Sequence, residues 1–250
     1  MSSNIEQRVL SEAQNATFDT EYHSPAEFAA KVAVLNRHFG ARPVRMLDAG
    51  GGNGSFTDAV LGEFPNWTST VIDVSRHLLA QNTVSERKTL LEGSIFDLRT
   101  LVPGRRFDLI SINWMLHHLV GRTYQESRRN IISALQVCCS ALNDGGLLCV
   151  GENRYQGIGD TNISSWLIYR LTSIETPAIA RLVGRHANTA GVGVCFQSER
   201  GWLELFSKSG LQERYPSFRY RPFQIRGLVK HALMLKVAGK IHYYLAPTRC

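Results

Sequence analysis

A glycine-rich segment bounded by acidic residues is the part of the sequence best suited to hold a ligand. Residues 48–54 read DAGGGNG, follow an apolar run and precede a helical pattern. Glycine has no Cβ and takes positive φ values at little cost, so such a segment turns tightly and lets its backbone approach a bound molecule. The start of the following helix offers amide hydrogens that have no partner within the helix. The segment therefore predicts a ligand-binding loop.

Two carboxylates indicate which kind of ligand this loop suits. Asp48 begins the segment, and Asp73 ends the next apolar run, 19 residues after Gly54. An acid at the second position accepts hydrogen bonds from the ribose hydroxyls of a nucleoside. Asp48 would repel a pyrophosphate, so we expect a positively charged nucleoside and not a dinucleotide. The alternative is that the glycines serve only a turn and that both acids are exposed.

The arrangement resembles the motifs of class I S-adenosylmethionine-dependent methyltransferases, whose cofactor carries a sulfonium and an ammonium group. The likeness lies in residues 48–54, where an acid is followed by glycine at every second position, and in residues 107–119, FDLISINWMLHHL. It implies that the region of Asp48 holds the amino acid end of the cofactor, Asp73 the ribose and residues 93–97 the adenine. The cofactor-binding residues that it implies are Asp48, Gly50, Gly52, Gly54, Asp73, Val74, Ser94, Ile95 and Asn113.

One position departs from this family pattern. Many relatives carry an acid directly after the glycine of the third motif, where it bonds the adenine amino group, and this chain has Ser94 there. The Ser94 hydroxyl and the nearby carboxylate of Asp97 are the two possible substitutes. The sequence leaves both open.

Methyl transfer requires an acceptor aligned with the methyl group, exclusion of water and, for many acceptors, a base. The candidates for that base are His186, Tyr155 and Glu152. His186 begins a stretch that loosely resembles the base-bearing segment of small-molecule O-methyltransferases; the alternative is an ordinary loop histidine. Tyr155 and Glu152 lie at the end of a predicted strand, where sheets of this kind bind ligands, and a purely structural turn is equally open for them.

Other polar and aromatic residues are weaker candidates for contact with the cofactor or the acceptor. We expect His117 and His118 to shape the cofactor pocket or to pack, with a substrate contact as the alternative. Trp166, Tyr169 and Phe196 are candidates to line an acceptor pocket, although aromatic residues in such helices more often belong to the core.

The elements that position these residues follow from the hydrophobic period. Strands are predicted near 44–50, 69–75, 87–93, 107–113 and 146–153, and helices near 25–39, 55–64, 76–83 and 123–142. Short connections between parallel strands must be right-handed crossovers, so helices should cover both faces of the sheet. With the resemblance, this predicts an α/β fold: a Rossmann-like, seven-stranded, mostly parallel sheet with an α-helical cap insertion.

We expect residues 1–250 to form a single domain. Its predicted parts are an N-terminal helical cap segment (1–40), a cofactor-binding core (41–153), a substrate-cap insertion (154–200) and a C-terminal helix and strand pair (201–250). Further helices are predicted near 162–174 and 177–186, and the last two strands near 214–223 and 230–238.

Composition excludes several classes of protein. Hydrophobic residues make up 44% and charged residues 20% of the 250, which are ordinary values for a folded chain. The five cysteines show no CxxC or Cys/His spacing, so neither a disulfide framework nor a metal site is predicted. No run approaches the roughly 18 apolar residues of a membrane span, and the N-terminus lacks a signal-peptide pattern. We therefore expect a cytoplasmic protein with free thiols.

The net charge of +7 is placed unevenly. Eight lysines and arginines and no acidic residue follow Glu213, so the first 213 residues have a net charge of −1. Aromatic residues alternate with these cations. The segment is read as a strand with one buried aromatic face, as a surface for single-stranded RNA, or as a positive patch for an anionic small molecule or an acidic carrier protein.

These observations predict metal-free transfer of a methyl group from S-adenosylmethionine to an oxygen or nitrogen of a small-molecule acceptor. If the basic C-terminal segment binds the acceptor, we expect the acceptor to be anionic or bound to a carrier protein. Nucleic acid is not the expected partner. The alternatives are an RNA or protein methyltransferase that uses the basic C-terminal segment, a catalytically inactive cofactor-binding protein, and a nicotinamide enzyme.

Overall fold

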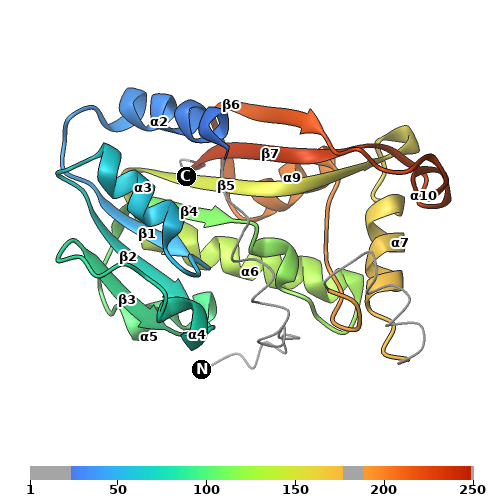
Figure 1. Cartoon of the computed structure of the whole chain (residues 1–250), viewed down its shortest axis with the longest axis horizontal. Coiled ribbons are helices and arrows are strands. Elements are labelled where there is room, and N and C mark those ends of the chain that lie inside the picture. The colour runs from blue at the N-terminus through green and yellow to red at the C-terminus, as the bar shows by residue number, and fades with distance from the viewer. Residues whose placement is uncertain (1–23, 177–188, 249–250) are drawn as a thin grey trace.

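A seven-stranded sheet forms the centre of the computed structural model, which describes residues 24–176 and 189–248 (Figure 1). The strand order is β3-β2-β1-β4-β5-β7-β6. The first five strands are parallel, and β7 lies antiparallel between β5 and β6. The strands are β1 (Arg45–Ala49), β2 (Thr68–Asp73), β3 (Lys88–Glu92), β4 (Phe107–Asn113), β5 (Leu142–Gly157), β6 (Leu211–Pro222) and β7 (Leu235–Pro247). The predicted seven-stranded, mostly parallel sheet is confirmed.

Helices cover both faces of this sheet, as predicted. In Figure 1, α2 and α3 lie on one side of it, and α6 and α9 lie on the other. The helices are α2 (Pro25–Phe39), α3 (Ser55–Glu63), α4 (Arg76–Leu79), α5 (Leu98–Leu101), α6 (Tyr124–Ala141), α7 (Ile163–Thr172), α9 (Glu199–Lys208) and α10 (Gly227–Ala232). Short 3-10 turns are η2 (Ile95–Asp97), η3 (Leu116–His118) and η4 (Ile158–Asp160).

Capping residues fix where α2 and α6 begin. The Glu27 backbone N–H donates to Ser24 Oγ (3.3 Å), and the Ser24 N–H donates back to the Glu27 carboxylate (2.8 Å). Before α6, the Glu126 N–H donates to Thr123 Oγ1 (3.1 Å). Each cap satisfies amide hydrogens that lack a partner within the helix, so both helices start where the sequence predicts.

The alternation of side chains along β1 separates two cores. Leu47 and Ala49 pack with residues of α6 and α9, whereas Met46 packs with residues of α2 and α3. Because successive side chains of a strand point to opposite faces, Asp48 lies on the same face as Met46. The carboxyl group of Asp48 is therefore buried beneath α2 and α3.

Three elements differ most from their predicted extents. The helix α4 is a single turn, shorter than the predicted 76–83. The strand β5 continues to Gly157, because it pairs with β7 along that extension. The predicted last strand near 230–238 is partly wrong: residues 230–232 belong to the exposed helix α10, and β7 starts at Leu235, where pairing with β5 begins.

The basic C-terminal segment does form the predicted strand pair, β6 and β7. Tyr215 and Tyr220 on β6 lie against His38 and His242, while Phe218 remains 47% exposed, so the aromatic face is only partly buried. The predicted helix at 177–186 lies outside the described residues. Among the described residues, no helix is long and apolar enough to cross a membrane.

Candidate functional site

The glycine loop joins the end of β1 to the start of α3, at the carboxyl edge of the parallel strands. Gly50 and Gly54 take left-handed conformations, with φ of 69° and 73°. A Cβ at Gly50 would lie 2.6 Å from Met115 Cγ, and one at Gly54 would lie 1.8 Å from Asn82 Oδ1. Both backbone conformation and packing therefore require glycine at these two positions.

Asp73, at the end of β2, fixes this loop from the side. Its Oδ2 accepts the Gly52 N–H (2.9 Å), and its Oδ1 accepts the Ser75 N–H (2.8 Å). Burial raises the pKa of Asp73, and these hydrogen bonds act in the opposite direction. Each carboxylate oxygen has two lone pairs and receives one of these bonds. Asp73 therefore keeps acceptor capacity for the hydroxyls of a ribose.

Asp48 and Lys31 place opposite charges beneath the loop. Both side chains are buried, Asp48 Oδ2 accepts the Thr57 hydroxyl (2.7 Å), and Lys31 Nζ donates to Asn113 Oδ1 (2.8 Å). Burial raises the pKa of Asp48 to about 6, opposed by Thr57 and Lys31. Burial lowers the pKa of Lys31 to about 8, opposed by Cys149, Asp48 and Glu27. Near pH 7 the carboxylate and the ammonium are both mostly charged.

Sequence reasoning missed Lys31, although its position carried a signal. The buried residues of α2 are Glu27, Lys31, Leu35 and Phe39. Residues four apart share one face of a helix, so this lysine belongs to the face that packs on the sheet. A lysine within an apolar stripe needs a partner in the interior. Here Asn113 supplies it, together with the Phe56 ring, whose centroid lies 4.3 Å from Lys31 Nζ.

The other predicted cofactor residues follow the ends of β2, β3 and β4. Val74 is half exposed after Asp73, and Ile95 is buried in η2. Ser94 Oγ accepts the Phe96 N–H (3.3 Å) and caps η2, while Asp97 is exposed. Asn113 ends β4 and donates to Ser111 Oγ (3.0 Å). The predicted set thus lies along one edge of the sheet, beside the glycine loop.

Glu152 joins to His117, a pairing that the sequence did not predict. Glu152 is fully buried, and its Oε2 lies 2.7 Å from His117 Nδ1. The His117 backbone N–H also donates to Glu152 Oε1 (3.3 Å). A carboxylate on one ring nitrogen fixes the tautomer and the orientation of an imidazole. Glu152 therefore holds His117 in place at the end of β4.

The rings of His117, Phe196 and Tyr155 form a continuous row, here called the aromatic wall. The Phe196 ring centroid lies 4.7 Å from that of His117 and 4.4 Å from that of Tyr155. The His118 ring lies 4.1 Å from His117, and burial lowers the pKa of His118 well below its usual value, with His117 adding to the effect. His118 is therefore neutral near pH 7.

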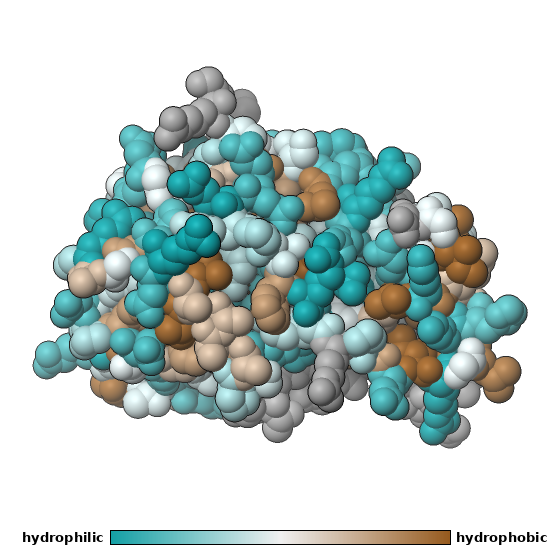
Figure 2. Space-filling view, turned by 90° about the horizontal axis from the view of Figure 1, so that it is seen from above, coloured by the Kyte–Doolittle hydropathy of each residue, from teal (hydrophilic) through white to brown (hydrophobic). Residues whose placement is uncertain are grey.

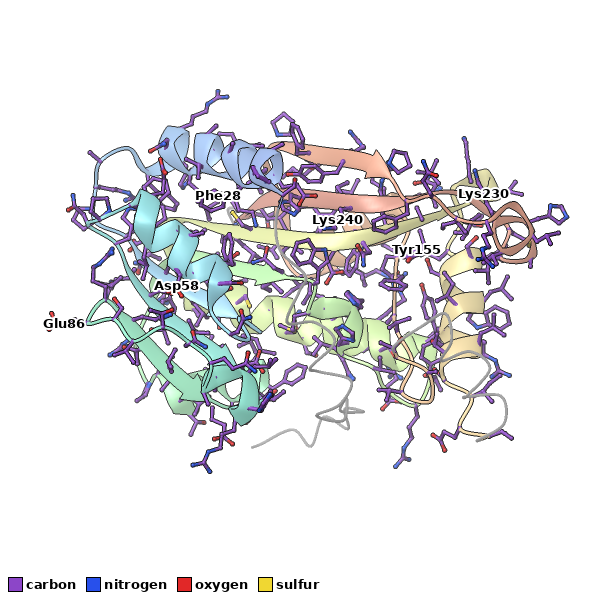
Figure 3. The ribbon with its side chains drawn as sticks, in the orientation of Figure 1. Phe28, Asp58, Glu86, Tyr155, Lys230 and Lys240 are labelled. Carbon is purple, nitrogen blue, oxygen red and sulfur yellow. The ribbon has the colours of Figure 1, made fainter. Side chains whose placement is uncertain are left out.

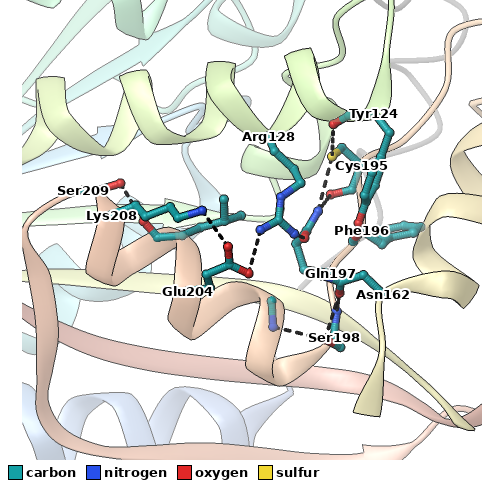
Figure 4. A network of polar contacts seen from close by, with 12 residues as sticks. Tyr124, Arg128, Asn162, Cys195, Phe196, Gln197, Ser198, Glu204, Lys208 and Ser209 are labelled. Atoms are coloured by element: carbon teal, nitrogen blue, oxygen red, sulfur yellow. Dashed lines mark hydrogen bonds and ion pairs between the residues drawn. The ribbon is translucent and has the colours of Figure 1, made fainter. Parts of the chain in front are cut away.

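A polar network anchors the segment that carries Phe196 (Figure 4). Arg128 of α6 donates to Gln197 Oε1 (2.6 Å) and pairs with Glu204 of α9 (3.0 Å). The Ser198 N–H and hydroxyl both donate to Asn162 Oδ1 (2.9 and 2.8 Å), just before α7. Three helices thus hold Phe196 against the wall.

Trp114 takes a strained backbone conformation directly after β4. Its φ of 51° is left-handed, and its N–H donates to the Gly151 carbonyl (2.8 Å). Non-glycine residues in this conformation cluster at functional sites. The Lys240 ammonium lies 4.6 Å from the Trp114 ring centroid, and Figure 3 shows Lys240 and Tyr155 along the same stretch of sheet between α2 and α7. The sequence carried no signal for Trp114 or Lys240.

The remaining candidates divide between core and surface. Tyr169 is buried and donates to the Gly121 carbonyl (3.1 Å), which is the core role, and Trp166 is partly exposed on α7. His186 lies outside the described residues. The four described cysteines are free, as expected. No group of metal-ligating side chains occurs in the part of the chain that the structure describes.

Residues 47–148 match the family model of the methyltransferase domain. Residues 47–148 thus carry a methyltransferase domain, and the chain has the fold of S-adenosylmethionine-dependent methyltransferases. The predicted family and cofactor are confirmed. No curated protein matches the chain in sequence.

Solved structures share the fold of this methyltransferase domain at low identity. A methyltransferase from Geobacter sulfurreducens in complex with S-adenosyl-L-homocysteine has a TM-score of 0.58 and 16% identity over 96% of this chain and 99% of that one. YjhP from E. coli has a TM-score of 0.59 and 15% identity over 94% and 98%. Mitomycin 7-O-methyltransferase MmcR has a TM-score of 0.53 and 19% identity over 88% of this chain. The chain spans about half of MmcR, 53% of its length.

The residues at the loop fit S-adenosylmethionine. Its ribose needs hydrogen-bond acceptors, and Asp73 has lone pairs to spare. Its amino acid end carries an ammonium and a carboxylate, and Asp48 and Lys31 supply the two opposite charges. A Cβ at Gly52 would meet only Leu78 Cδ1, at 3.6 Å among the described atoms, so the loop is open on that side.

Proposed function

We propose that the chain transfers the methyl group of S-adenosylmethionine to an oxygen or nitrogen of a small-molecule acceptor. The observation that carries this proposal is the position of the aromatic wall next to the glycine loop, at the carboxyl edge of the same sheet. Ligands of open parallel sheets bind in the crevice at this edge, where the strand order reverses. Here the reversal lies between β1 and β4, whose ends carry Asp48 and Asn113.

Asp73 and the Asp48–Lys31 pair hold the cofactor in this proposal. Asp73 accepts the ribose hydroxyls, Asp48 faces the ammonium, and Lys31 faces the carboxylate. Val74, with Ser94 and Ile95 of the third motif, borders the adenine. The bound cofactor supplies a methyl group activated by positively charged sulfur, so the chain's own residues have to align the acceptor, keep water out and remove a proton.

His117 is the base that the geometry favours, with Glu152 as its positioning residue. A proton on Nδ1 directed at Glu152 leaves the lone pair of Nε2 available to accept a proton. Glu152 itself is fully buried, so it acts on the acceptor through His117. Tyr155, across Phe196, is the rival base, and His186 remains a candidate from the sequence.

The acceptor class is supported by two observations. The Phe196 and Tyr155 rings stack 4.4 Å apart and give the region beside His117 an apolar border, which suits a ring-containing small molecule. MmcR, which shares the fold, is named a mitomycin 7-O-methyltransferase.

Labelled S-adenosylmethionine and fractionated cell extract test the proposal directly. We expect label in the small-molecule fraction, and its loss in Asp73→Ala. Label in RNA or protein would show that the chain is an RNA or protein methyltransferase instead. Binding of RNA should then also fall steeply as the salt concentration rises. Cofactor binding without label in any fraction would indicate an inactive binder. A rise in melting temperature with NAD alone would favour a nicotinamide enzyme.

A further inference from the structure

One end of the molecule, beyond the end of β5, exposes a group of apolar side chains. This apolar tip consists of Ile158, Ile163, Trp166, Leu228, Val229 and Met234. Leu228 is 88% exposed, Ile158 is 64% exposed and the other four are 42–46% exposed. Figure 2 shows brown side chains at the right-hand end, where Figure 1 places α7 and α10. Single exposed apolar residues are ordinary, but six of them gathered at one end of the molecule indicate a contact surface.

Hydrogen bonds hold the parts of the tip together. The Ile158 N–H and the Ser164 hydroxyl both donate to the Met234 carbonyl (3.1 and 3.0 Å). Met234 takes a left-handed φ of 50°, which turns the chain from α10 into β7. The helix α10 itself has no buried residue. The tip is thus a protrusion with a fixed base, and it has the shape of an inserting element and not of a groove.

Cations surround these apolar side chains. Residues 158–172 and 223–237, which build the tip, contain Arg170, Arg226, Lys230 and Lys236 against a single acidic residue, Asp160. Arg226, Lys230 and Lys236 are exposed, and Figure 3 labels Lys230 at this end. The Arg170 guanidinium lies 5.9 Å from the Trp166 ring centroid. This end of the molecule therefore combines exposed apolar side chains with an excess of positive charge.

We infer that this tip docks on a membrane surface of anionic phospholipid. Transfer of exposed apolar side chains into the acyl boundary is favourable. Each nearby lysine or arginine adds about 1 kcal/mol of favourable interaction with anionic headgroups. Tryptophan is also favoured at the boundary between headgroups and hydrocarbon. A protein partner would need a cavity to receive Leu228, whereas a bilayer adapts to a protruding side chain.

Docking would bring the proposed acceptor site close to the lipid. Phe223 lies at the base of the connection that carries α10, and its ring centroid is 6.5 Å from that of Tyr155. An acceptor dissolved in the membrane would then have a short path to the aromatic wall. This consequence rests on the proposed function, whereas the docking does not.

Flotation of the full chain with lipid vesicles tests the inference. We expect the protein to float with phosphatidylcholine vesicles that contain phosphatidylglycerol, to stay behind with phosphatidylcholine alone, and to be released by high salt. The double variant L228E/V229E should bind at least about tenfold more weakly. Its control is V84E, because Val84 is 97% exposed in the loop before β3, away from the tip. Arg226→Gln with Lys230→Gln should also weaken binding, whereas R105Q should not.

Three results would overturn the inference: no flotation with anionic vesicles, equal flotation of wild type and L228E/V229E, or an equal loss in V84E. Binding of the same residues to an acidic carrier protein, with no binding to vesicles, would also overturn it. S-adenosyl-L-homocysteine binding, measured without lipid, shows whether each variant is folded. Methyl transfer to a soluble acceptor, measured without lipid, keeps the failure of docking distinct from the failure of the proposed function.

Discussion

The cofactor side and the acceptor side of the sheet edge are built in different ways. On the cofactor side, the loop of residues 48–54 and Asp73 act largely through backbone conformation and hydrogen bonds within a short stretch of chain. On the acceptor side, His117, Glu152 and Phe196 come from three separate segments and meet through side chains. A ligand held by local backbone leaves a motif in the sequence, whereas one held by distant side chains does not.

The two sides also differ in how they use buried charge. Asp48 and Lys31 are both buried, and each keeps its own polar partner, Thr57 and Asn113. Neither is neutralised by a direct ion pair with the other among the contacts of the described residues, so both charges remain available to a zwitterionic ligand. Glu152, in contrast, is committed to His117. We expect charge changes to affect binding on the first side and rate on the second.

The largest effect should follow the loss of the proposed base. His117→Asn should lower the single-turnover rate of methyl transfer roughly 10²- to 10⁴-fold, with S-adenosyl-L-homocysteine affinity unchanged within about threefold. Glu152→Gln should lower the rate less and shift its pH profile, because the imidazole loses its charged partner. If His186→Ala or Tyr155→Phe abolishes methyl transfer while His117→Asn leaves its rate unchanged, His117 is not the base.

Asp73→Ala should have the next largest effect, on binding. Hydrogen bonds to a charged group contribute about 1.5–3 kcal/mol, so we expect S-adenosyl-L-homocysteine affinity by calorimetry to fall about 10- to 100-fold. Asp144→Ala, which removes an exposed carboxylate near the start of β5, is the matched control and should change nothing. Equal affinities for Asp73→Ala and wild type would remove the ribose contact from the cofactor side.

The pH dependence of cofactor binding should reflect Asp48 and Lys31. Below the raised pKa of Asp48, about 6, protonation removes the charge that faces the ammonium. Above the lowered pKa of Lys31, about 8, deprotonation removes the charge that faces the carboxylate. Calorimetric affinity should therefore be highest between these values and fall by up to about tenfold per pH unit outside them.

Lys31→Met sharpens this prediction. The variant should bind S-adenosyl-L-homocysteine more weakly at pH 7. Its affinity should no longer fall above pH 8, because Lys31 is absent, but it should still fall below pH 6, because Asp48 remains. Lys236→Met, an exposed lysine on β7 far from the loop, serves as the control. An unchanged fall in affinity above pH 8 in Lys31→Met would show that Lys31 does not face the ligand.

The smallest effect concerns the adenine contact. Ser94 already accepts a hydrogen bond as the cap of η2, whereas Asp97 is exposed with its carboxylate available. We expect Asp97→Ala to lower S-adenosyl-L-homocysteine affinity about three- to tenfold and Ser94→Ala to lower it less, both measured by calorimetry. The reverse order would assign the adenine contact to the serine.

The sequence predicted the features that depend on neighbours along the chain. The capping box at Ser24, the period of the strands and the spacing of the glycines each act within a few residues, and the structure has them where they were predicted. Residues 230–232 were misjudged as strand, because an apolar run bordered by basic residues fits a strand and an exposed helix equally well. Pairing of β7 with β5 decided between them.

The sequence by itself thus predicted the fold class and the cofactor, because the hydrophobic period, the glycine loop and the family resemblance that this loop carries all lie within short stretches of chain. Only the tertiary structure decided that Lys31 is buried against Asn113 and that Glu152 reaches His117, 35 positions earlier in the chain. The physical reason is that a side chain gains or loses its charge, and finds its partner, through burial by elements far away in sequence. A local pattern can place Lys31 on the buried face of α2, but it does not name the partner that the side chain meets there.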